Sequence, residues 1–515
     1  MLHRIALMML IAFPGSIAFA HEHDHANGHD SQEKEQPAPE AKVSVTSHEI
    51  RIGDRTISYT ATAGTMLMKN EKDEPRALIG YTAYVADVDD QRLRPLMFAY
   101  NGGPGSASIW LHMGALGPQR AVVEDVGFSP AGPFERVTNE YSVLDVADLV
   151  MIDPVGTGFS KAVGKAENTD FWGVDQDIRS VSAFIVKYVT ENGRWASPKY
   201  VLGESYGGMR TGGVTYELLN RYNMALNGIV LVSPFMEMTT GFAGLGVDLP
   251  HVLYLPSYAA TAWYHDALDE KPEDLEAFLE EVKQFAIKEY APALLAGSRL
   301  GEAERRSVLA GLSRYTGLSE EYWDRANLRI DEGHFTQQLL REHGITVGRV
   351  DSRFSGPTLN ALAESAPDDP FMTAIGPSYL AAFMDYYHDD LGVEATGKYV
   401  VSGGFFTQWD WSHIQPDMEG FELPFPNTAI DLEYAMKKNP AMQILVLQGY
   451  FDLATPMFAT EYVLGHMNLT PELRDNIEMK YFESGHMMYV HEPSLAKFKA
   501  ALAEFVQSSY RENAD

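Results

Sequence analysis

The sequence predicts an α/β protein with a mainly parallel central sheet and an inserted helical cap. Short apolar runs that end in polar, turn-rich loops are typical of buried parallel strands. The chain contains such runs in LRPLMFAYN, ADLVMIDP, KYVLGES, GIVLVSP and MQILVLQG. Helical patterns such as FWGVDQDIRSVSAFIVKYVTEN separate some of them, as happens where helices connect parallel strands. Residues 236–428 break this alternation with mainly helical segments, which predicts the cap.

The first 20 residues have the three parts of an export signal. A basic start, MLHR, precedes the apolar run IALMMLIAF, and small residues at Ala18 and Ala20 form a cleavage site. The apolar run has nine residues, whereas a helix needs roughly 20 to cross a bilayer. We therefore expect cleavage after Ala20 and a secreted or periplasmic protein, without a membrane partner once the signal is removed.

Residues 21–42 are expected to form a disordered, histidine-rich leader, because HEHDHANGHDSQEKEQPAPEAK contains almost no large apolar side chain. Four histidines, His21, His23, His25 and His29, offer nitrogen ligands to a transition metal. Coordination would first have to order a flexible segment, which opposes binding. A solvated tail and a metal-binding or interaction segment are both open interpretations.

The rest of the chain divides into three predicted segments. Residues 43–235 form the first part of the core and begin with the alternating strand patterns HEIRIG and RTISYTATAG. Residues 236–428 form the helical cap, and residues 429–515 complete the core, ending in the helical pattern SLAKFKAALAEFVQ.

Composition excludes several classes of function. Lys and Arg number 40 against 71 Asp and Glu, a net charge of -31, so the chain has no basic stripe for a nucleic-acid partner. The chain has no cysteine, which excludes disulfides, a thiolate nucleophile and cysteine-ligated zinc. Any nucleophile must be an oxygen or a nitrogen, and we expect no cofactor and no catalytic metal.

A candidate nucleophile lies in KYVLGESYGGMRTGGV, where an apolar strand meets a helical pattern. The segment Gly203-Glu204-Ser205-Tyr206-Gly207 fits a nucleophile elbow, a sharp strand-to-helix turn that exposes a serine hydroxyl. The alternative is a tight glycine turn whose serine has no chemical role.

A serine nucleophile needs a base and an orienting carboxylate. In the α/β-hydrolase fold these follow in the order serine, acid, histidine, each after a strand. Asp452 follows MQILVLQG, and His486 follows IEMKYF, which matches that order. His491 is a competing base, but it lies nearer the last helical pattern, and Asp452 is also an ordinary turn residue.

Backbone N–H groups are the usual donors to the oxyanion of an acyl-transfer intermediate. The glycine-rich segment Asn101-Gly102-Gly103-Pro104-Gly105 follows the strand pattern LMFAY. We expect the amides of Gly103 and Tyr206 to form this oxyanion hole, although NGGPG is also consistent with an ordinary loop.

Together, NGGPGSASIWLHMGALGP, MIDPVGTGFS, GESYGG, LQGYFDLATP and SGHMMY resemble the motifs of the serine carboxypeptidases, peptidase family S10. The matches keep the family's order from about residue 95 to 490. The resemblance implies an α/β-hydrolase fold, the triad Ser205, Asp452 and His486, and an exopeptidase that removes C-terminal residues from peptide substrates. It also implies that Asn101 and Glu204 bind the substrate carboxylate. Two carboxyl groups share a hydrogen bond only if one keeps its proton, so such binding favours acid pH.

Two departures from the family pattern bear on substrate recognition. The family usually has a second glutamate where this chain has Ala115, and many eukaryotic members have a cysteine at the position of Ser106. The chain therefore resembles a bacterial-type member, and Ala115 leaves an esterase or acyltransferase as an alternative. Met487, next to the base, is a candidate for a side-chain pocket or for core packing, as are Met488, Trp409 and Trp411.

Overall fold

The computed structural model describes residues 40–394, 397–418 and 420–511. The predicted export signal and residues 21–39 of the predicted leader lie outside these residues. None of the described helices is both long enough and apolar enough to cross a membrane.

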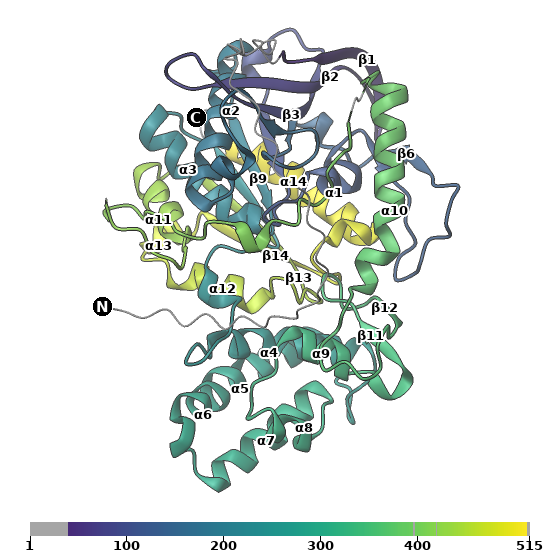
Figure 1. The fold of residues 1–515 in the computed structure, drawn as a ribbon, viewed down its shortest axis with the longest axis vertical. Coiled ribbons are helices and arrows are strands. Elements are labelled where there is room, and N and C mark those ends of the chain that lie inside the picture. The colour runs from purple at the N-terminus through teal and green to yellow at the C-terminus, as the bar shows by residue number, and fades with distance from the viewer. Residues whose placement is uncertain (1–39, 395–396, 419, 512–515) are drawn as a thin grey trace, which may run out of the picture. The chain divides into compact units, whose positions relative to one another are not determined.

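A ten-stranded sheet forms the centre of the fold (Figure 1). From one edge to the other its strands are β1 (Val43–Ile52), β2 (Arg55–Lys69), β3 (Pro75–Ala86), β7 (Asp148–Ile152), β4 (Leu96–Tyr100), β9 (Lys199–Glu204), β10 (Gly228–Val232), β13 (Gln443–Gly449) and β14 (Ile477–Phe482). A short strand, β8 (Lys161–Ala162), pairs with β3. The six strands from β7 to β14 are parallel, and β1 to β3 add an antiparallel edge. The predicted mainly parallel sheet is confirmed.

Strand β4 shows why these apolar runs form central strands. All five of its residues are buried, and successive side chains point to opposite faces of the sheet. Leu96, Phe98 and Tyr100 belong to one hydrophobic core, whereas Met97 and Ala99 belong to another. A strand with a core on each face has no polar alternation, which is the pattern seen in the sequence.

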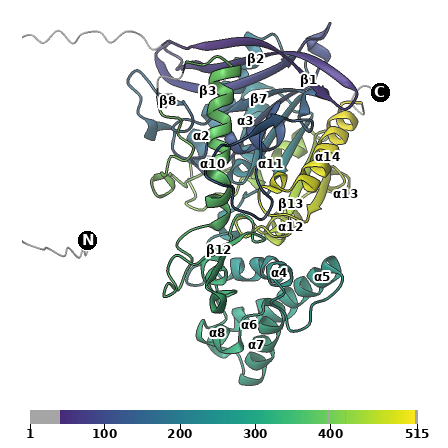
Figure 2. The ribbon, with the colours of Figure 1, turned by 90° about the vertical axis from the view of Figure 1, so that its right-hand side faces the viewer.

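Helices cover both faces of the sheet (Figures 1 and 2). One core contains residues of α2 (Val174–Glu191), α3 (Tyr206–Tyr222) and α11 (Ala429–Lys438). The other contains residues of the short α1 (Ile109–Leu111), α10 (Pro370–Asp385) and α14 (Glu492–Arg511). Two further helices, α12 (Met457–His466) and α13 (Pro471–Arg474), connect β13 to β14. A small hairpin of β5 (Gln119–Ala121) and β6 (Arg136–Thr138) lies in the chain between β4 and β7.

The insertion between β10 and β13 has two structural parts. Its first part is a helical layer with its own hydrophobic core, formed by α4 (Leu249–Tyr264), α5 (Leu275–Phe285), α6 (Ala291–Ala296), α7 (Glu302–Thr316), α8 (Glu320–Arg325) and α9 (Glu332–Gln338). Residues that follow β13, including Tyr450 and Phe451, pack into that core. After the hairpin of β11 (Ile345–Val347) and β12 (Ser355–Pro357), α10 joins the core of the sheet instead. The helical layer is therefore shorter than the expected cap of residues 236–428, because α10 buries its apolar side chains in the core on one face of the sheet, where it contacts α1 and β5.

A buried histidine in the segment between α10 and α11 binds carboxylates on α2 and α11. His413 Nδ1 lies 2.6 Å from an oxygen of Asp175 on α2, and its Nε2 lies 2.8 Å from an oxygen of Asp431 on α11. Burial lowers the pKa of His413, but hydrogen bonds to Asp175 and Asp431 and their charges raise it to about 9 overall. The imidazolium donates from both nitrogens, one to each carboxylate.

We expect the protein to lose stability at alkaline pH because of this cluster. The folded pKa of about 9 lies above the ordinary value of 6.5, so the stabilisation is complete below pH 6.5 and is lost as the pH rises through 9. Between pH 7 and pH 10 the free energy of unfolding should fall by an amount on the order of 2 kcal/mol. It should fall by less in His413→Gln over the same interval. Thermal unfolding of both proteins at the two pH values measures this difference. An equal loss in both proteins would contradict this role.

Candidate active site

Ser205 lies at a sharp turn between β9 and α3. Its backbone has φ 64° and ψ -128°, a conformation that a non-glycine residue adopts only when its surroundings hold it. The N–H of Ser205 donates to the carbonyl of Val232 at 3.0 Å, and its carbonyl accepts from Gly208 and Phe235 at 2.8 and 2.9 Å. These bonds, to β10, to the residues just after it and to the first turn of α3, fix the turn with the serine at the carboxyl end of the sheet.

Two glycines allow the tight packing around this turn. A Cβ on Gly203 would lie 2.3 Å from the carbonyl oxygen of Gly207, and one on Gly102 would lie 2.5 Å from the backbone nitrogen of Tyr206. Only a residue without a side chain fits at such separations. The glycine-rich loop after β4 therefore lies directly against the backbone of the serine turn.

Asp452 is hydrogen-bonded to His486, which lines the same cavity as Ser205. His486 Nδ1 lies 2.9 Å from Asp452 Oδ2. The other carboxylate oxygen, Asp452 Oδ1, accepts the backbone N–H groups of Ala454 and Thr455 at 2.8 and 2.9 Å. Thr455 Oγ1 lies 2.8 Å from Asp452 Oδ2 and 3.0 Å from His486 Nδ1. Asp452 is fully buried, so this network holds the carboxylate in one orientation.

Asp452 also controls the charge of the imidazole. Burial alone lowers the pKa of His486, but the charge of Asp452 and its hydrogen bond outweigh burial, so that the pKa rises above 6.5. Within the described chain, the Ser205 hydroxyl has no hydrogen-bond partner within 3.5 Å, although Ser205 and His486 line the same cavity. Catalytic hydrogen bonds are often long in enzymes without substrate.

The cavity has a volume of about 450 Å³ and lies between the sheet and the helical layer. Most of the predicted site residues line it: Asn101, Gly103, Glu204, Ser205, Tyr206, His486 and Met487. His491 does not line it, and its Nδ1 instead lies 2.8 Å from Ser494 Oγ. The geometry thus separates the two histidines that the sequence left in competition.

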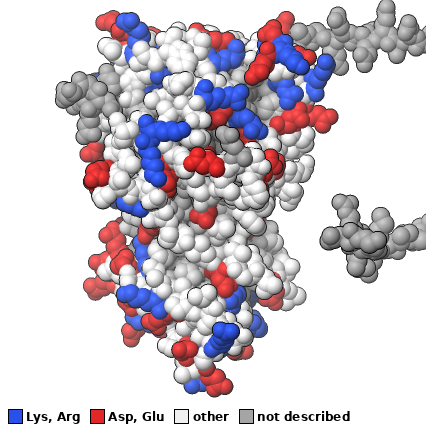
Figure 3. Space-filling model, turned by 90° about the vertical axis from the view of Figure 1, so that its left-hand side faces the viewer, with Lys and Arg blue, Asp and Glu red and all other residues white. Residues whose placement is uncertain are grey.

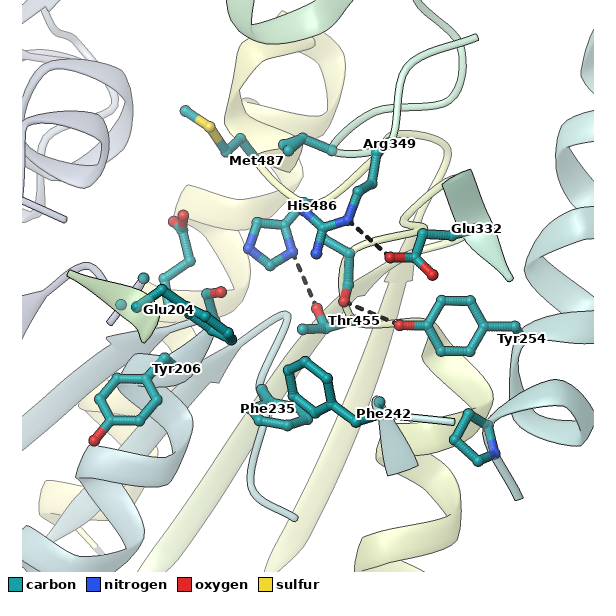
Figure 4. A pocket seen from close by; sticks show the side chains of 18 of the residues that line it. Glu204, Tyr206, Phe235, Phe242, Tyr254, Glu332, Arg349, Thr455, His486 and Met487 are labelled. Atoms are coloured by element: carbon teal, nitrogen blue, oxygen red, sulfur yellow. Dashed lines mark hydrogen bonds and ion pairs between the residues drawn. The ribbon is translucent and has the colours of Figure 1, made fainter. Parts of the chain in front are cut away.

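A buried carboxyl group, Glu204, faces the same cavity (Figure 4). Asn101 Nδ2 donates to one of its oxygens at 2.9 Å, and the hydroxyl of Tyr489 donates to the other at 2.8 Å. Burial raises the pKa of Glu204 to about 7, against lowering effects from His486 and the two hydrogen bonds. Glu204 therefore exchanges its proton near neutral pH, unlike an exposed glutamate.

Arg210 holds the glycine-rich loop in place through a hydrogen bond to its backbone. Its guanidinium is fully buried, donates to the carbonyl of Asn101 at 2.7 Å and to Asp177 at 2.7 Å, and lies over the rings of Tyr100 and Tyr206. Removing one partner of such a buried pair leaves an unpaired charge. The pair therefore ties the loop to α2 and α3.

Other predicted residues lie outside the cavity. Ala115 is buried in the sheet's core, and Met488 is also fully buried. Trp409 and Trp411 contact the ring of Tyr206 at centroid distances of 5.5 and 5.9 Å without lining the cavity. Among the described residues, no group of three or more histidines and carboxylates has the geometry to hold a metal.

Several lining residues were not found by sequence reasoning. Arg349, between β11 and β12, and Glu332, which begins α9, approach each other to 3.6 Å at one side of the cavity. Tyr254 of α4 lies beside them (Figure 4). Thr455 lines the cavity, and Tyr489 bonds to Glu204 without lining it. Both lie close in the chain to the predicted residues Asp452 and His486, which was an available signal.

Comparison with known proteins agrees with this architecture. The family model "Serine carboxypeptidase" matches residues 71–291, which include Ser205 but end before Asp452. "Serine carboxypeptidase-like 9" of Arabidopsis thaliana is 26% identical over 185 residues, 34% of this chain and 40% of that protein. "Serine carboxypeptidase-like 8" of the same plant is 27% identical over 128 residues, 24% of this chain and 28% of that protein. The matched region thus spans less than half the length of each relative.

A solved structure matches over most of the chain. It is Kex1(delta)p, a prohormone-processing carboxypeptidase from Saccharomyces cerevisiae, with a TM-score of 0.50, 15% identity, and coverage of 90% of this chain and 92% of that chain. The fold is the α/β-hydrolase fold, as the sequence predicts. The part of the chain from residue 71 to residue 291 is thus similar to the serine carboxypeptidases, peptidase family S10.

Proposed function

We propose that the protein is a serine carboxypeptidase that releases C-terminal amino acids from peptides. The observation that carries the proposal is the position of Glu204: a carboxyl group able to keep its proton near neutral pH shares a cavity with Ser205 and His486. A protonated carboxyl can donate a hydrogen bond to the free carboxylate of a peptide, with Asn101 beside it. An enzyme that does not select free C-termini has no need of such a group.

The reaction follows from the positions of these groups. His486 accepts the proton of the Ser205 hydroxyl, and the oxygen attacks the last peptide carbonyl, while Asp452 stabilises the imidazolium. The amides of Gly103 and Tyr206, which both line the cavity, donate to the oxyanion. His486 then protonates the leaving amine, and water releases the shortened peptide from the acyl-enzyme by the reverse proton path.

A blocked dipeptide with a free C-terminus and its C-terminal amide test this function directly. At pH 5 we expect kcat/KM for the free acid to exceed that for the amide by roughly 100-fold, because a hydrogen bond to a charged group contributes about 1.5–3 kcal/mol. Equal values for the two substrates would remove the exopeptidase assignment. An esterase or acyltransferase, which Ala115 keeps as the second candidate, would act on an ester with no preference for a free carboxylate.

We expect the preference for free C-termini to depend on pH through Glu204. Below pH 7 the carboxyl is protonated and donates to the substrate; above about pH 7 it is ionised and repels it. For the free acid, kcat/KM should therefore fall by about tenfold per pH unit above pH 7. For the amide, kcat/KM should not fall above pH 7. On the acid side, both substrates should lose activity as His486 becomes protonated.

Glu204→Gln provides the matched test, because glutamine keeps an N–H donor at every pH. The variant should cleave the free acid without the alkaline fall. A fall at the same pH in Glu204→Gln would assign the titration to another group.

The location of the protein is part of the proposal. The predicted signal at residues 1–20 supports a secreted or periplasmic enzyme acting on peptides, after cleavage that follows Ala20. The N-terminal sequence of the protein recovered from culture medium or periplasm would establish the cleavage position.

A further inference from the structure

A buried tyrosine outside the cavity contacts the candidate carboxylate-binding group. Tyr489 is 2% exposed and does not line the cavity, but its hydroxyl donates to Glu204 Oε2 at 2.8 Å. It follows His486 by three residues, in the segment SGHMMY. Any influence of Tyr489 on a substrate therefore passes through Glu204 or through the segment that carries the base.

Close packing holds the ring of Tyr489 in place. A Cβ on Gly114 would lie 2.5 Å from two of its ring carbons, so only a residue without a side chain fits there. The ring of Phe498, on α14, packs edge-on against it at a centroid distance of 6.3 Å. In such a close-packed core the hydroxyl has little freedom to leave Glu204.

Glu204 has a side-chain donor on each of its two oxygens. Asn101 Nδ2 donates to Oε1, and Tyr489 donates to Oε2. Asn101 Oδ1 accepts the backbone N–H of Leu111 at 3.0 Å, which keeps the amide NH₂ directed at Glu204. The two donors together orient the carboxyl group. Asn101 also lines the cavity, whereas Tyr489 acts from behind Glu204.

The partner that Tyr489 provides is a neutral one. Ala115 is buried and ends in a methyl group, so it offers Glu204 no second carboxyl group, and Gly114 just before it packs against the tyrosine ring. Burial and the charge of Glu204 raise the pKa of Tyr489 well above its ordinary value of 10. Tyr489 therefore donates to Glu204 without placing a negative charge near the carboxylate of a substrate.

The hydrogen bond from Tyr489 favours the ionised form of Glu204. A hydrogen bond to a charged acceptor is roughly twice as strong as one to a neutral acceptor, so the hydroxyl opposes burial, which raises the pKa of Glu204. The charge of protonated His486 acts with the hydroxyl, and the charge of Asp452 acts with burial. Tyr379, on α10, is a further titratable group near this carboxyl, and burial raises its pKa, so that it is neutral as well.

We propose that Tyr489 is a positioning residue for the recognition of free C-termini: its neutral hydroxyl orients Glu204 and sets the pH above which this recognition is lost. This role rests on the proposed function, in which Glu204 binds the free carboxylate. Without the hydroxyl, Glu204 keeps its proton to a higher pH, because the ionised form loses more than the protonated form. Recognition then does not require a carboxyl group at Ala115, because the second partner of Glu204 comes from the segment of the base.

Tyr489→Phe tests this role through the pH profiles of kcat/KM for the free acid and the amide of a blocked dipeptide. For the free acid, the alkaline fall should move upward from about pH 7 by about one pH unit. For the amide, the pH dependence should stay that of the parent protein. A purely structural loss would lower kcat/KM for both substrates and leave the fall at the parent's pH, which would overturn the proposal.

Tyr379→Phe is the matched control. It removes a buried hydroxyl that lies 2.7 Å from a Cβ placed on the same Gly114, and within the described residues this hydroxyl makes no hydrogen bond to Glu204. Its alkaline fall should stay near pH 7, and a shift equal to that of Tyr489→Phe would contradict the assignment to Tyr489.

Glu204→Gln separates this role from the proposed function. Because glutamine does not titrate, adding Tyr489→Phe to Glu204→Gln should produce no alkaline fall. If Glu204→Gln alone keeps the fall, the use of Glu204 in the proposed function fails. If Glu204→Gln loses the fall but Tyr489→Phe does not move it, Tyr489 has no such role and the exopeptidase stands.

Salt separates the local hydrogen bond from the charge of the whole protein. Acidic and basic side chains are spread over the surface drawn in Figure 3, and the chain has a net charge of -31. Ions screen exposed charges, whereas Glu204 and Tyr489 are buried, where screening is much weaker. The shift should therefore be the same at about 0.05 M and about 0.5 M salt. Its disappearance at the higher concentration would contradict the role of the hydroxyl.

Replacing Tyr489 by 3-fluorotyrosine gives a change of the opposite sign and applies even if Tyr489→Phe does not fold. The fluorinated ring keeps its hydroxyl, and its more acidic phenol is the stronger hydrogen-bond donor to a carboxylate. The alkaline fall for the free acid should move below pH 7. A fall that stays at the parent's pH, or moves upward, would overturn the proposal.

Discussion

Replacing Ser205 by alanine should lower kcat for a C-terminal amino acid by roughly 10⁴- to 10⁶-fold, the range found when a catalytic serine is removed from other triads. The reason is that the turn between β9 and α3, where the backbone of Ser205 has φ 64°, presents this hydroxyl to the cavity, and alanine has none. Steady-state or single-turnover assays on a blocked dipeptide measure the loss.

Alanine occupies the same backbone conformation as serine with one atom fewer, so the thermal unfolding of Ser205→Ala should match that of the parent protein. Ser180→Ala, on α2 and outside the cavity, is a matched control that should keep full activity. Turnover by Ser205→Ala at the parent rate would remove the serine from the mechanism.

Asp452→Asn should have the next largest effect, a fall in kcat of about 10⁴-fold. Two backbone N–H groups, of Ala454 and Thr455, point at Asp452 Oδ1. The asparagine must therefore place its carbonyl oxygen there and turn its NH₂ toward His486. The imidazole then accepts at Nδ1 and carries its proton on Nε2, where it cannot receive the proton of Ser205.

Asp274→Asn serves as the control for this exchange of carboxylate for amide. Asp274 caps α5 by accepting the N–H of Ala277 at 3.0 Å, and asparagine caps helices equally well. That variant should keep its activity. If Asp452→Asn also keeps more than a tenth of the parent kcat, the carboxylate does not orient the base.

The sequence predicted the parts of the fold whose local pattern decides their structure. Strands buried on both faces, such as β4, read as continuous apolar runs, and the glycines around Ser205 mark a turn in which a Cβ would clash with neighbouring backbone atoms. The helical layer was predicted because its helices also have a clear local pattern in the sequence. However, helical periodicity does not say which core a helix joins. The sequence therefore predicts α10 as part of the cap, although its apolar side chains lie in a core of the sheet beside α1 and β5.

The site residues fall into two groups, those that a local pattern predicts and those that depend on contacts between distant segments. Ser205, Asp452 and His486 each follow a strand of the sheet, and parallel strands bring such positions to one edge. Arg349 and Glu332 reach the cavity from the helical layer, whose position over the sheet depends on contacts between distant segments. No spacing within the chain encodes that approach, so these two residues required the structure.

We propose, in sum, that one cavity joins an acyl-transfer serine to a group that binds a free C-terminus. Mass spectrometry of a peptide digested between pH 4 and pH 8 tests it most directly. We expect a ladder of products, each shorter by one residue from the C-terminus, that forms more slowly above pH 7. Internal fragments, loss of residues from the N-terminus, or equal digestion of the C-terminal amide would contradict it.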